Sequence, residues 1–402
     1  MIYKCQGCGA NPVYDPEKKK LVCPACGGED TAEIDPAKSE NPKLCPVCMG
    51  ELPFAQYTAA DRCPFCGNSL IFDEYVTGKY EPKMIAPFRI GKDRAQELMK
   101  EKFSKQKFAP KDLLTATSLD KIEGWYVPFW LYDYDTNMVY RGEGRQIDTR
   151  TEGDVEITTT KHYDVERDMD ASFSRIPVDA SDAMPDDTMD LLAPFDYADA
   201  QDFDTKYLSG FSAEYYNHSA QELKPRSDSK MEGYAKTLVR DKAKTGSHGT
   251  YDELSEKELR VTQKKTDSSY SMFPVWRYDY KYHDESYPFY INGQTGKIVG
   301  KAPLAKERVW ASAGIVFAVA LAIFLLLHFF VIQNLPIWAA IVIPAVIALI
   351  YAGVNMKPSA GVNTETAQTY LVAGSAKVNA SRDAFVHTTE TRREIKRAEE
   401  AK

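Results

Sequence analysis

Eight cysteines in the first 66 residues constrain the fold of this 402-residue chain more than any other feature. They form four Cys-x2-Cys pairs; fourteen residues separate the two pairs of each half, and the pattern recurs at an offset of 40 residues. Because two such turns supply the tetrahedral thiolate shell that zinc prefers, the spacing predicts two tandem zinc ribbons, residues 1–35 and 40–75, each with one structural zinc ion. The expected ligands are Cys5, Cys8, Cys23 and Cys26 in the first ribbon and Cys45, Cys48, Cys63 and Cys66 in the second.

Other uses of these thiols fit the sequence less well. A disulfide framework would need an oxidising compartment, and no signal peptide precedes Cys5. A thioredoxin-type pair requires a βαβ context rather than loops rich in glycine and proline. Iron in a rubredoxin-like site is an open alternative, since four tetrahedral sulfurs suit both metals. The tight bends around the sulfurs are expected at Gly7, Gly9, Pro24, Gly27, Pro46, Gly50, Pro64 and Gly67.

Two apolar runs, 309–332 and 335–354, lie towards the other end of the chain. Each is about as long as the twenty helical residues that cross the roughly 30 Å core of a bilayer, so we expect a transmembrane hairpin of two helices. Basic residues flank the pair, whereas the connecting turn is uncharged, which places both termini and the tail 355–402 in the cytoplasm. The chain is therefore predicted to be a multi-pass protein of the cell membrane. The flanking residues are Lys301, Lys306, Arg308 and Lys357.

Residues 83–303, between the ribbons and the apolar runs, contain an internal repeat. The aromatic segment 126–134 resembles 272–280, and each is entered through a proline, Pro128 or Pro274. An amphipathic stretch precedes each copy, at 93–108 and at 229–243. We therefore expect an α+β cytoplasmic region with a duplicated helix-plus-antiparallel-sheet unit. The two copies are 83–180 and 225–303, and an acidic helical insert occupies 181–224.

Finer predictions concern the individual elements. The first copy is expected to continue into strands 137–147 and 154–166, with turns at Gly142 and Gly144 or at Gly153. The second is expected to continue into strands 286–291 and 297–300 about an Asn292-Gly293 turn. Segment 181–206, with eight aspartates and one lysine, predicts an acidic amphipathic helix. The charged segment 392–397 predicts a helix in the tail.

Charge and residue pattern exclude some classes of function. The formal net charge of −8 and pI near 5.5 disfavour nucleic acid as the main partner, because phosphate binding requires a basic face. No Ser/His/Asp or Cys/His grouping is evident, and a zinc ion with four protein ligands has no open position for catalysis. We therefore expect no enzyme activity and no small-molecule substrate. The repeated tryptophans and tyrosines are expected in the core of a half-buried sheet.

Five further segments give the chain a family resemblance: 127–133, 176–181, 194–196, 207–214 and 292–297. With the tandem ribbons and the apolar runs, they resemble the bacterial YdjG-like zinc-ribbon membrane proteins, which are also described as TFIIB-type from their ribbons. The resemblance implies a phage-shock-type membrane stress system with SPFH (flotillin-like) and phage-shock-protein-A-like partners. It brings no catalytic residue.

These observations favour a membrane-anchored zinc-ribbon adaptor or scaffold that recruits protein partners to the cytoplasmic face of a bacterial membrane. Two alternatives stay open at this point. One is a membrane-tethered regulator that binds nucleic acid through the ribbons, where Lys18, Lys19 and Lys20 lie at a hairpin tip. The other is a zinc or redox sensor, which requires weakly held metal or reactive thiols.

Overall fold

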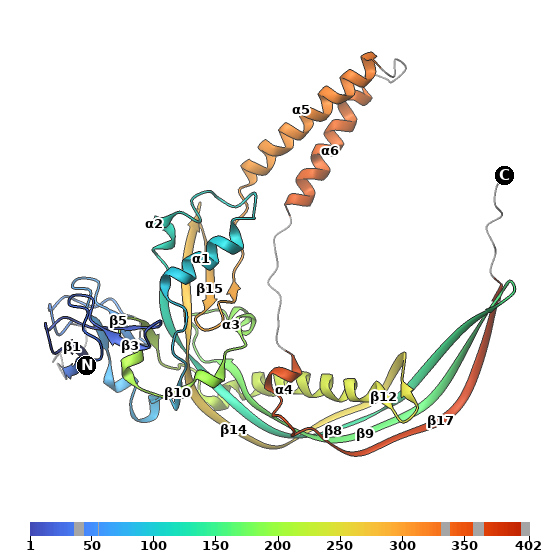
Figure 1. Cartoon of the computed structure of the whole chain (residues 1–402), viewed down its shortest axis with the longest axis horizontal. Coiled ribbons are helices and arrows are strands. Elements are labelled where there is room, and N and C mark those ends of the chain that lie inside the picture. The colour runs from blue at the N-terminus through green and yellow to red at the C-terminus, as the bar shows by residue number, and fades with distance from the viewer. Residues whose placement is uncertain (36–43, 55, 331–337, 357–365, 395–402) are drawn as a thin grey trace. The chain divides into compact units, whose positions relative to one another are not determined.

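The computed structural model describes residues 1–35, 44–54, 56–330, 338–356 and 366–394, and it has the mixed α+β composition expected (Figure 1). The chain forms two compact units. Two strands of thirty residues, β8 (Glu123–Glu152) and β14 (Glu253–Tyr282), are hydrogen-bonded neighbours and contribute to both units. Unit 1 comprises Met1–Val127, Ala183–Tyr215 and Met272–Asn363, and unit 2 comprises Pro128–Asp182, Tyr216–Ser271 and Thr364–Lys402.

The two ribbons begin unit 1 and are built from short antiparallel strands. In ribbon 1, β1 pairs with β4 and β2 pairs with β3. In ribbon 2, β5 pairs with β6 and also joins the main sheet, because β11 pairs with both β5 and β8. The bounds are β1 (Ile2–Cys5), β2 (Val13–Asp15), β3 (Lys20–Val22), β4 (Ala32–Asp35), β5 (Thr58–Arg62), β6 (Ser69–Ile71) and β11 (Ser212–Glu214).

The rest of unit 1 extends this sheet in the order β10-β7-β14-β8-β11-β5-β6, and β15 and β16 follow on from β14. Helix α1 packs through Ala95, Met99 and Phe103, which lie on one face because they are four residues apart. The remaining elements are η1 (Asp73–Tyr75), η2 (Gly78–Tyr80), β7 (Met84–Ile85), α1 (Lys92–Phe103), α2 (Ala116–Leu119), α3 (Asp186–Leu192), η3 (Tyr197–Asp199), β10 (Gln201–Asp202), η4 (Thr205–Leu208), β15 (Glu285–Asn292) and β16 (Ile298–Val299).

Unit 2 is a four-stranded sheet in the order β14-β8-β9-β17, with α4 (Ala220–Ala243) along one face (Figure 1). Strand β9 (Val155–Asp179) pairs antiparallel with β8 on one side and with β17 (Lys377–Glu394) on the other. A capping box formed by Ser219 and Glu222 begins α4. The buried face of the helix carries Ser227, Met231, Ala235, Leu238 and Val239, and the unit also contains β12 (Thr245–Gly246), β13 (Gly249–Thr250) and α7 (Ala367–Tyr370).

Each aromatic strand of the repeat packs with the helix of the other copy. In unit 2, Trp130 of the first copy donates from Nε1 to the carbonyl of His218 at 2.9 Å, two residues before α4. In unit 1, Trp276 of the second copy donates to the carbonyl of Ile90 at 2.9 Å, two residues before α1. The compact units therefore do not coincide with the ranges 83–180 and 225–303. The tyrosine two residues after each tryptophan also forms a hydrogen bond across the copies. Tyr132 OH donates to Ala220 O at 2.6 Å, and Tyr278 OH donates to Leu113 O at 3.2 Å.

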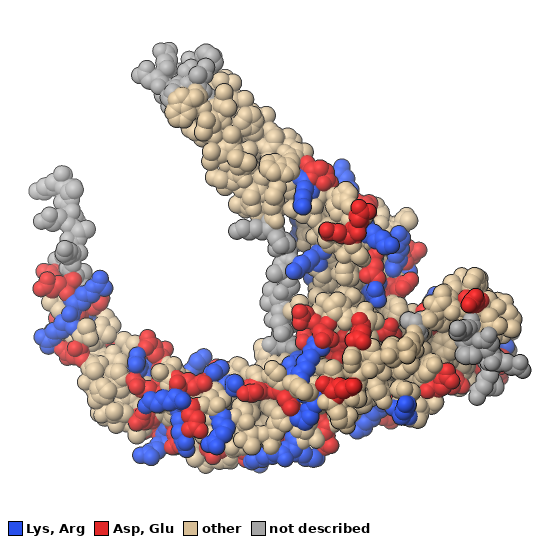
Figure 2. Space-filling model, turned by 180° about the vertical axis from the view of Figure 1, so that it is seen from behind, with Lys and Arg blue, Asp and Glu red and all other residues tan. Residues whose placement is uncertain are grey.

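The apolar runs form helices α5 (Lys306–Phe330) and α6 (Ala339–Asn355). Among the described residues, the segment Lys306–Leu327 is the one helix long and apolar enough to cross a membrane, and α6 is a shorter apolar helix. Beyond Arg308, the described parts of both helices contain no Lys, Arg, Asp or Glu, and Figure 2 shows this part of their surface as uncharged. The predicted turn between the spans lies outside the described residues. The large apolar side chains that are more than half exposed on the described part of α5 are Trp310, Ile315, Val319, Ile323 and Leu326.

The strands of the first copy are longer than the sequence predicted. The expected strands 137–147 and 154–166 are parts of β8 and β9, which begin earlier or end later. Gly142 and Gly144 lie inside β8, and the turn is at Gly153, whose φ is +63°. The two inner glycines serve close packing instead, since a Cβ on Gly142 would lie 2.5 Å from the carbonyl oxygen of Ser255. The expected hairpin 286–300 is confirmed by β15 and β16.

Four helix predictions need correction. Segment 181–206 is not one helix: α3 is short, and Asp196 and Asp204 accept hydrogen bonds from nearby backbone N–H groups, which favours turns over helix. The tail residues Arg392 to Glu394 lie on β17, where pairing with β9 overrides the local helical preference, and 395–397 lie outside the described residues. The second amphipathic helix begins at Ala220 rather than 229, and the first ends at Phe103 rather than 108.

A buried ion pair fastens β17 to the sheet. Arg167 of β9 donates from Nη2 to Asp383 Oδ1 at 2.8 Å, and the two side chains are 3% and 2% exposed. Asp383 also accepts from the N–H of Ser247 at 2.9 Å. Burial would raise the pKa of Asp383, but the Ser247 N–H and the Arg167 guanidinium outweigh it and hold the pKa below its ordinary value.

Asp383→Asn is expected to lower the free energy of unfolding of unit 2 by about 3 kcal/mol, because Arg167 would stay buried without its counter-charge. Hydrogen exchange at the β17 amides should rise accordingly. The stabilisation is present above the ordinary carboxyl pKa of about 3.9 and should disappear as the pH falls through the lower folded-state pKa. As a control, Asp267→Asn removes an exposed carboxylate paired with Lys265 and should change stability by less than about 1 kcal/mol.

Candidate metal centres and the surfaces around them

The eight cysteines gather into two groups of four, as predicted. In each group all four Sγ atoms lie within 4.8 Å of one another. The shortest Sγ–Sγ distances are 3.6 Å for Cys5–Cys26 and 3.5 Å for Cys8–Cys23 in ribbon 1, and 3.8 Å for Cys45–Cys66 and 3.7 Å for Cys48–Cys63 in ribbon 2. A metal–sulfur distance of about 2.3 Å gives tetrahedral edges of about 3.8 Å, whereas a disulfide needs about 2.05 Å. Both groups could hold a metal ion, and zinc fits them.

The backbone around each Cys-x2-Cys turn, or knuckle, is nearly identical. The carbonyl of the first cysteine accepts a hydrogen bond from the residue after the second, for example Gly9 N to Cys5 O at 2.7 Å. That donor residue has a positive φ in every knuckle, and it is glycine in three of them. In the third knuckle it is Met49, with φ +61°, so the left-handed residue is Met49 and not the expected Gly50.

Hydrogen bonds and burial shift the pKa values of the cysteine thiols in different directions. The Thr31 hydroxyl and the backbone N–H groups of Cys8 and Gly7 lower the pKa of Cys5 to about 6. Burial raises the pKa of Cys45 to about 12. A bound cation would favour the thiolate at all four positions of a site, which is the form that a metal requires.

Segment 207–214 holds both ribbons against the rest of unit 1. Ser209 Oγ donates to Pro12 O of ribbon 1 at 2.7 Å, and Ser212 Oγ donates to Asp61 Oδ1 of ribbon 2 at 2.8 Å. The backbone of this segment comes close to ribbon 1 at Gly210, where φ is +94° and an added Cβ would lie 2.8 Å from Val13 Cβ. Burial raises the pKa of Asp61, which is half-buried at this contact. One of the five family-like segments is thereby explained as a structural clamp.

Gly210→Val is expected to release the ribbons without unfolding them, because the added side chain needs an unfavourable φ and overlaps Val13. Limited proteolysis should cut between the ribbons and the rest of unit 1 at least about tenfold faster, while bound metal stays unchanged. Gly233→Ala is a suitable control, since a Cβ on Gly233 meets no atom within 4 Å. Equal cleavage of both variants would contradict the clamp.

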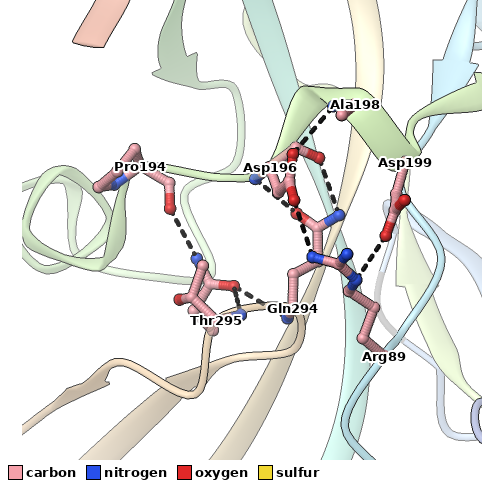
Figure 3. Close-up of polar contacts among 8 residues, drawn as sticks. Arg89, Pro194, Asp196, Ala198, Asp199, Gln294 and Thr295 are labelled. Carbon is pink, nitrogen blue, oxygen red and sulfur yellow. Dashed lines mark hydrogen bonds and ion pairs between the residues drawn. The ribbon is translucent and has the colours of Figure 1, made fainter.

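Two other family-like segments, 194–196 and 292–297, meet in unit 1 (Figure 3). Gln294 donates to Asp196 O at 3.0 Å and accepts from Asp196 N at 3.1 Å. Arg89 forms ion pairs with both Asp196 and Asp199. These contacts join the turn after β15 to segment 194–196 and hold it in place.

A cavity of about 880 Å³ lies between the ribbons and the start of β8. Trp125, Phe211 and Trp276 line it, together with carboxylates such as Asp61 and Glu123. Trp130, by contrast, packs against Tyr216 and Tyr270 in unit 2. The sequence prediction that the repeated aromatics form sheet core holds for Trp276, which is 4% exposed although it also borders the cavity, whereas Trp125 and Trp130 are half-buried.

The knuckles of the two ribbons differ in their outer side chains. Ribbon 2 exposes Val47, Met49 and Phe65, which are 48%, 63% and 66% exposed; we call them the knuckle patch. At the offset of 40 residues, ribbon 1 has Gly7, Gly9 and Ala25. Aligning the two halves of the sequence shows this difference, whereas the cysteine spacing by itself indicates only the expected metal ligands. The duplicated ribbons therefore present unlike surfaces.

A curated relative shares most of the chain. The uncharacterized protein YdjG of Bacillus subtilis (strain 168) is 32% identical over 319 residues, which cover 77% of this chain and 92% of YdjG. The chain belongs to the YdjG family. No protein-family model matches it, and no solved structure matches it.

We expect two zinc ions per chain in the purified protein, measured by elemental mass spectrometry. Replacing Cys45 and Cys48 by Ser should leave one, because a site with two thiolates loses the closed tetrahedral shell. Replacing Ser39 and Ser104 by Ala should leave two. Iron instead of zinc in the wild type would reassign the metal, and two zinc ions in the double cysteine variant would contradict the ligand set.

Proposed function

We propose that this member of the YdjG family is a membrane-anchored zinc-ribbon adaptor that recruits protein partners to the cytoplasmic face of a bacterial membrane. The knuckle patch is the observation that carries the proposal. Three large apolar side chains at the tip of a small ribbon are not required by the ribbon fold, since the equivalent residues of ribbon 1 are glycine and alanine. Exposed apolar clusters of this kind are typical of protein docking sites.

The proposed anchor is the hairpin of α5 and α6. Strand β17, after the helices, pairs with β9, before them. Both strands therefore lie on the same side of any membrane, which requires an even number of crossings between them. This parity supports a second span at α6 once α5 is taken as the first. The exposed apolar side chains on both helices support their insertion into a membrane. The basic residues at the outer ends of the helices support a cytoplasmic location for both termini.

The class of partner is proposed from the family resemblance. It names an SPFH (flotillin-like) protein and a phage-shock-protein-A-like protein, and with them a role in membrane stress. In this proposal the zinc ions are structural, because all four ligands of each site are cysteines, and they fix the knuckles that present Val47, Met49 and Phe65. No chemistry at the metal and no small-molecule substrate is part of it.

Val47→Gly, Met49→Gly and Phe65→Ala, combined, give ribbon 2 the knuckle residues of ribbon 1 and should abolish partner capture. The expected loss is at least about tenfold in recovered partner, because exposed apolar anchors dominate such interfaces. Affinity capture from native membranes with mass spectrometry makes the measurement, and zinc content checks that the ribbon is folded. Cys45→Ser with Cys48→Ser should lose the same partner while the protein stays in the membrane.

Ile34→Ala is the matched control, because Ile34 is an exposed apolar residue of ribbon 1, 52% exposed, outside the knuckles. It should capture the partner normally. Unchanged capture by the triple variant would refute a docking role for the patch.

The nucleic-acid alternative has less support. Lys18 and Lys20 at the hairpin tip both pair with Glu29, which reduces the charge available to phosphate. The sensor alternative has one observation in its favour, since Cys8, Cys26, Cys48 and Cys66 are exposed. Thiol labelling of the zinc-loaded protein separates sensor from adaptor: rapid labelling without a chelator favours a sensor, and slow labelling favours a structural site.

A further inference from the structure

The sheet of unit 2 ends in two long open edges. In the described part of the chain, β17 has a strand neighbour on one side only, which is β9. On the outer side of β14, β15 pairs with Val275–Tyr282, and no described strand pairs there with residues 253–267. Unpaired N–H and C=O groups along such edges are templates for a further strand.

The side chains on these edges are solvated. Every residue of β17 is exposed apart from Asp383 and Ala384, and Phe385 is 56% exposed. Most residues of β14 before Ser271 are exposed too. The outer strands of unit 2 are therefore held by strand pairing, while most of their side chains lie in solvent.

One row of charged side chains crosses the sheet from one edge to the other. Glu258 of β14 pairs with Arg141 of β8 at 2.9 Å, and Arg141 pairs with Glu166 of β9 at 2.7 Å. Glu166 stands opposite Arg382 of β17. The row thus alternates acid, base, acid, base from Glu258 to Arg382. At the β14 edge, Glu258 also pairs with Arg260 of its own strand at 3.3 Å.

Strand directions allow the row to continue into another molecule. Arg141 pairs with Glu258 and Arg145 with Glu253, so numbers rise along β8 as they fall along β14, and the two strands are antiparallel. Strands β8, β9 and β17 are antiparallel in turn. A second copy whose β14 lies beside β17 would therefore preserve the antiparallel alternation.

We propose that copies of this chain associate head to tail, the β14 edge of one copy pairing with the β17 edge of the next and Arg382 meeting Glu258 of the second copy. The contact is heterologous, since different surfaces meet, so it generates a ring or a filament rather than a closed dimer. The proposal is independent of the adaptor function, because it uses no ribbon residue.

The test uses full-length protein in detergent micelles or nanodiscs and measures its mass by analytical ultracentrifugation. The wild type should form assemblies of more than one chain. Arg382→Glu and Glu258→Arg should each weaken association by about tenfold or more, because each puts like charges together at every contact. Zinc content and circular dichroism confirm that the variants fold.

Mixing the two variants gives the sharper result. Every contact between an Arg382→Glu chain and a Glu258→Arg chain joins opposite charges, so the equimolar mixture should regain the wild-type assemblies. Arg94→Glu, an exposed reversal on α1, should assemble normally. A single-chain wild type, a mixture that stays dissociated, or an effect of Arg382→Glu without one of Glu258→Arg would each overturn the proposal, the last by pointing to β17 pairing with itself.

Discussion

The hydrogen-bonded pair of β8 and β14 is the constraint on which the rest of the structure depends. Strands in globular proteins usually have three to ten residues, and at about 3.3 Å per residue these two are several times longer than one core requires. Each strand has an aromatic part that builds a core and a polar part that runs on through the solvent. Strands β7, β9, β11 and β15 pair with these two strands directly, and the second ribbon joins them through β11.

The aromatic parts also explain why the duplicated halves remain recognisable. Trp130 and Trp276 perform the same task, a hydrogen bond to a carbonyl two residues before a helix. An indole N–H buried against a sheet must find an acceptor, and a helix entrance offers one at a fixed place. Each copy thereby positions the other's helix, and neither copy is complete without its partner.

The sequence predicted those features whose determinants are local. Cysteine spacing predicted both groups of four cysteines residue by residue, because the cysteines and the turns that carry them are close in the sequence. The hairpin about Asn292-Gly293 was predicted for the same reason. Strand β17 was missed because its partner, β9, lies about two hundred residues earlier, and pairing at that distance decides the conformation of Arg392 and its neighbours. The exchange of helices was equally invisible, since a repeat pattern does not say which copy packs on which.

The position of β17 at the end of the chain has a consequence for synthesis. Strands β8, β9 and β14 and helix α4 all precede α5, whereas β17 follows α6. While the chain grows, β9 keeps an open edge until both apolar helices have been made, because domains assemble from the N-terminus as they emerge. If those helices are the anchor, β17 can pair with β9 only when the chain has returned to the side of the membrane on which β9 lies. Completion of the sheet then reports that insertion has succeeded.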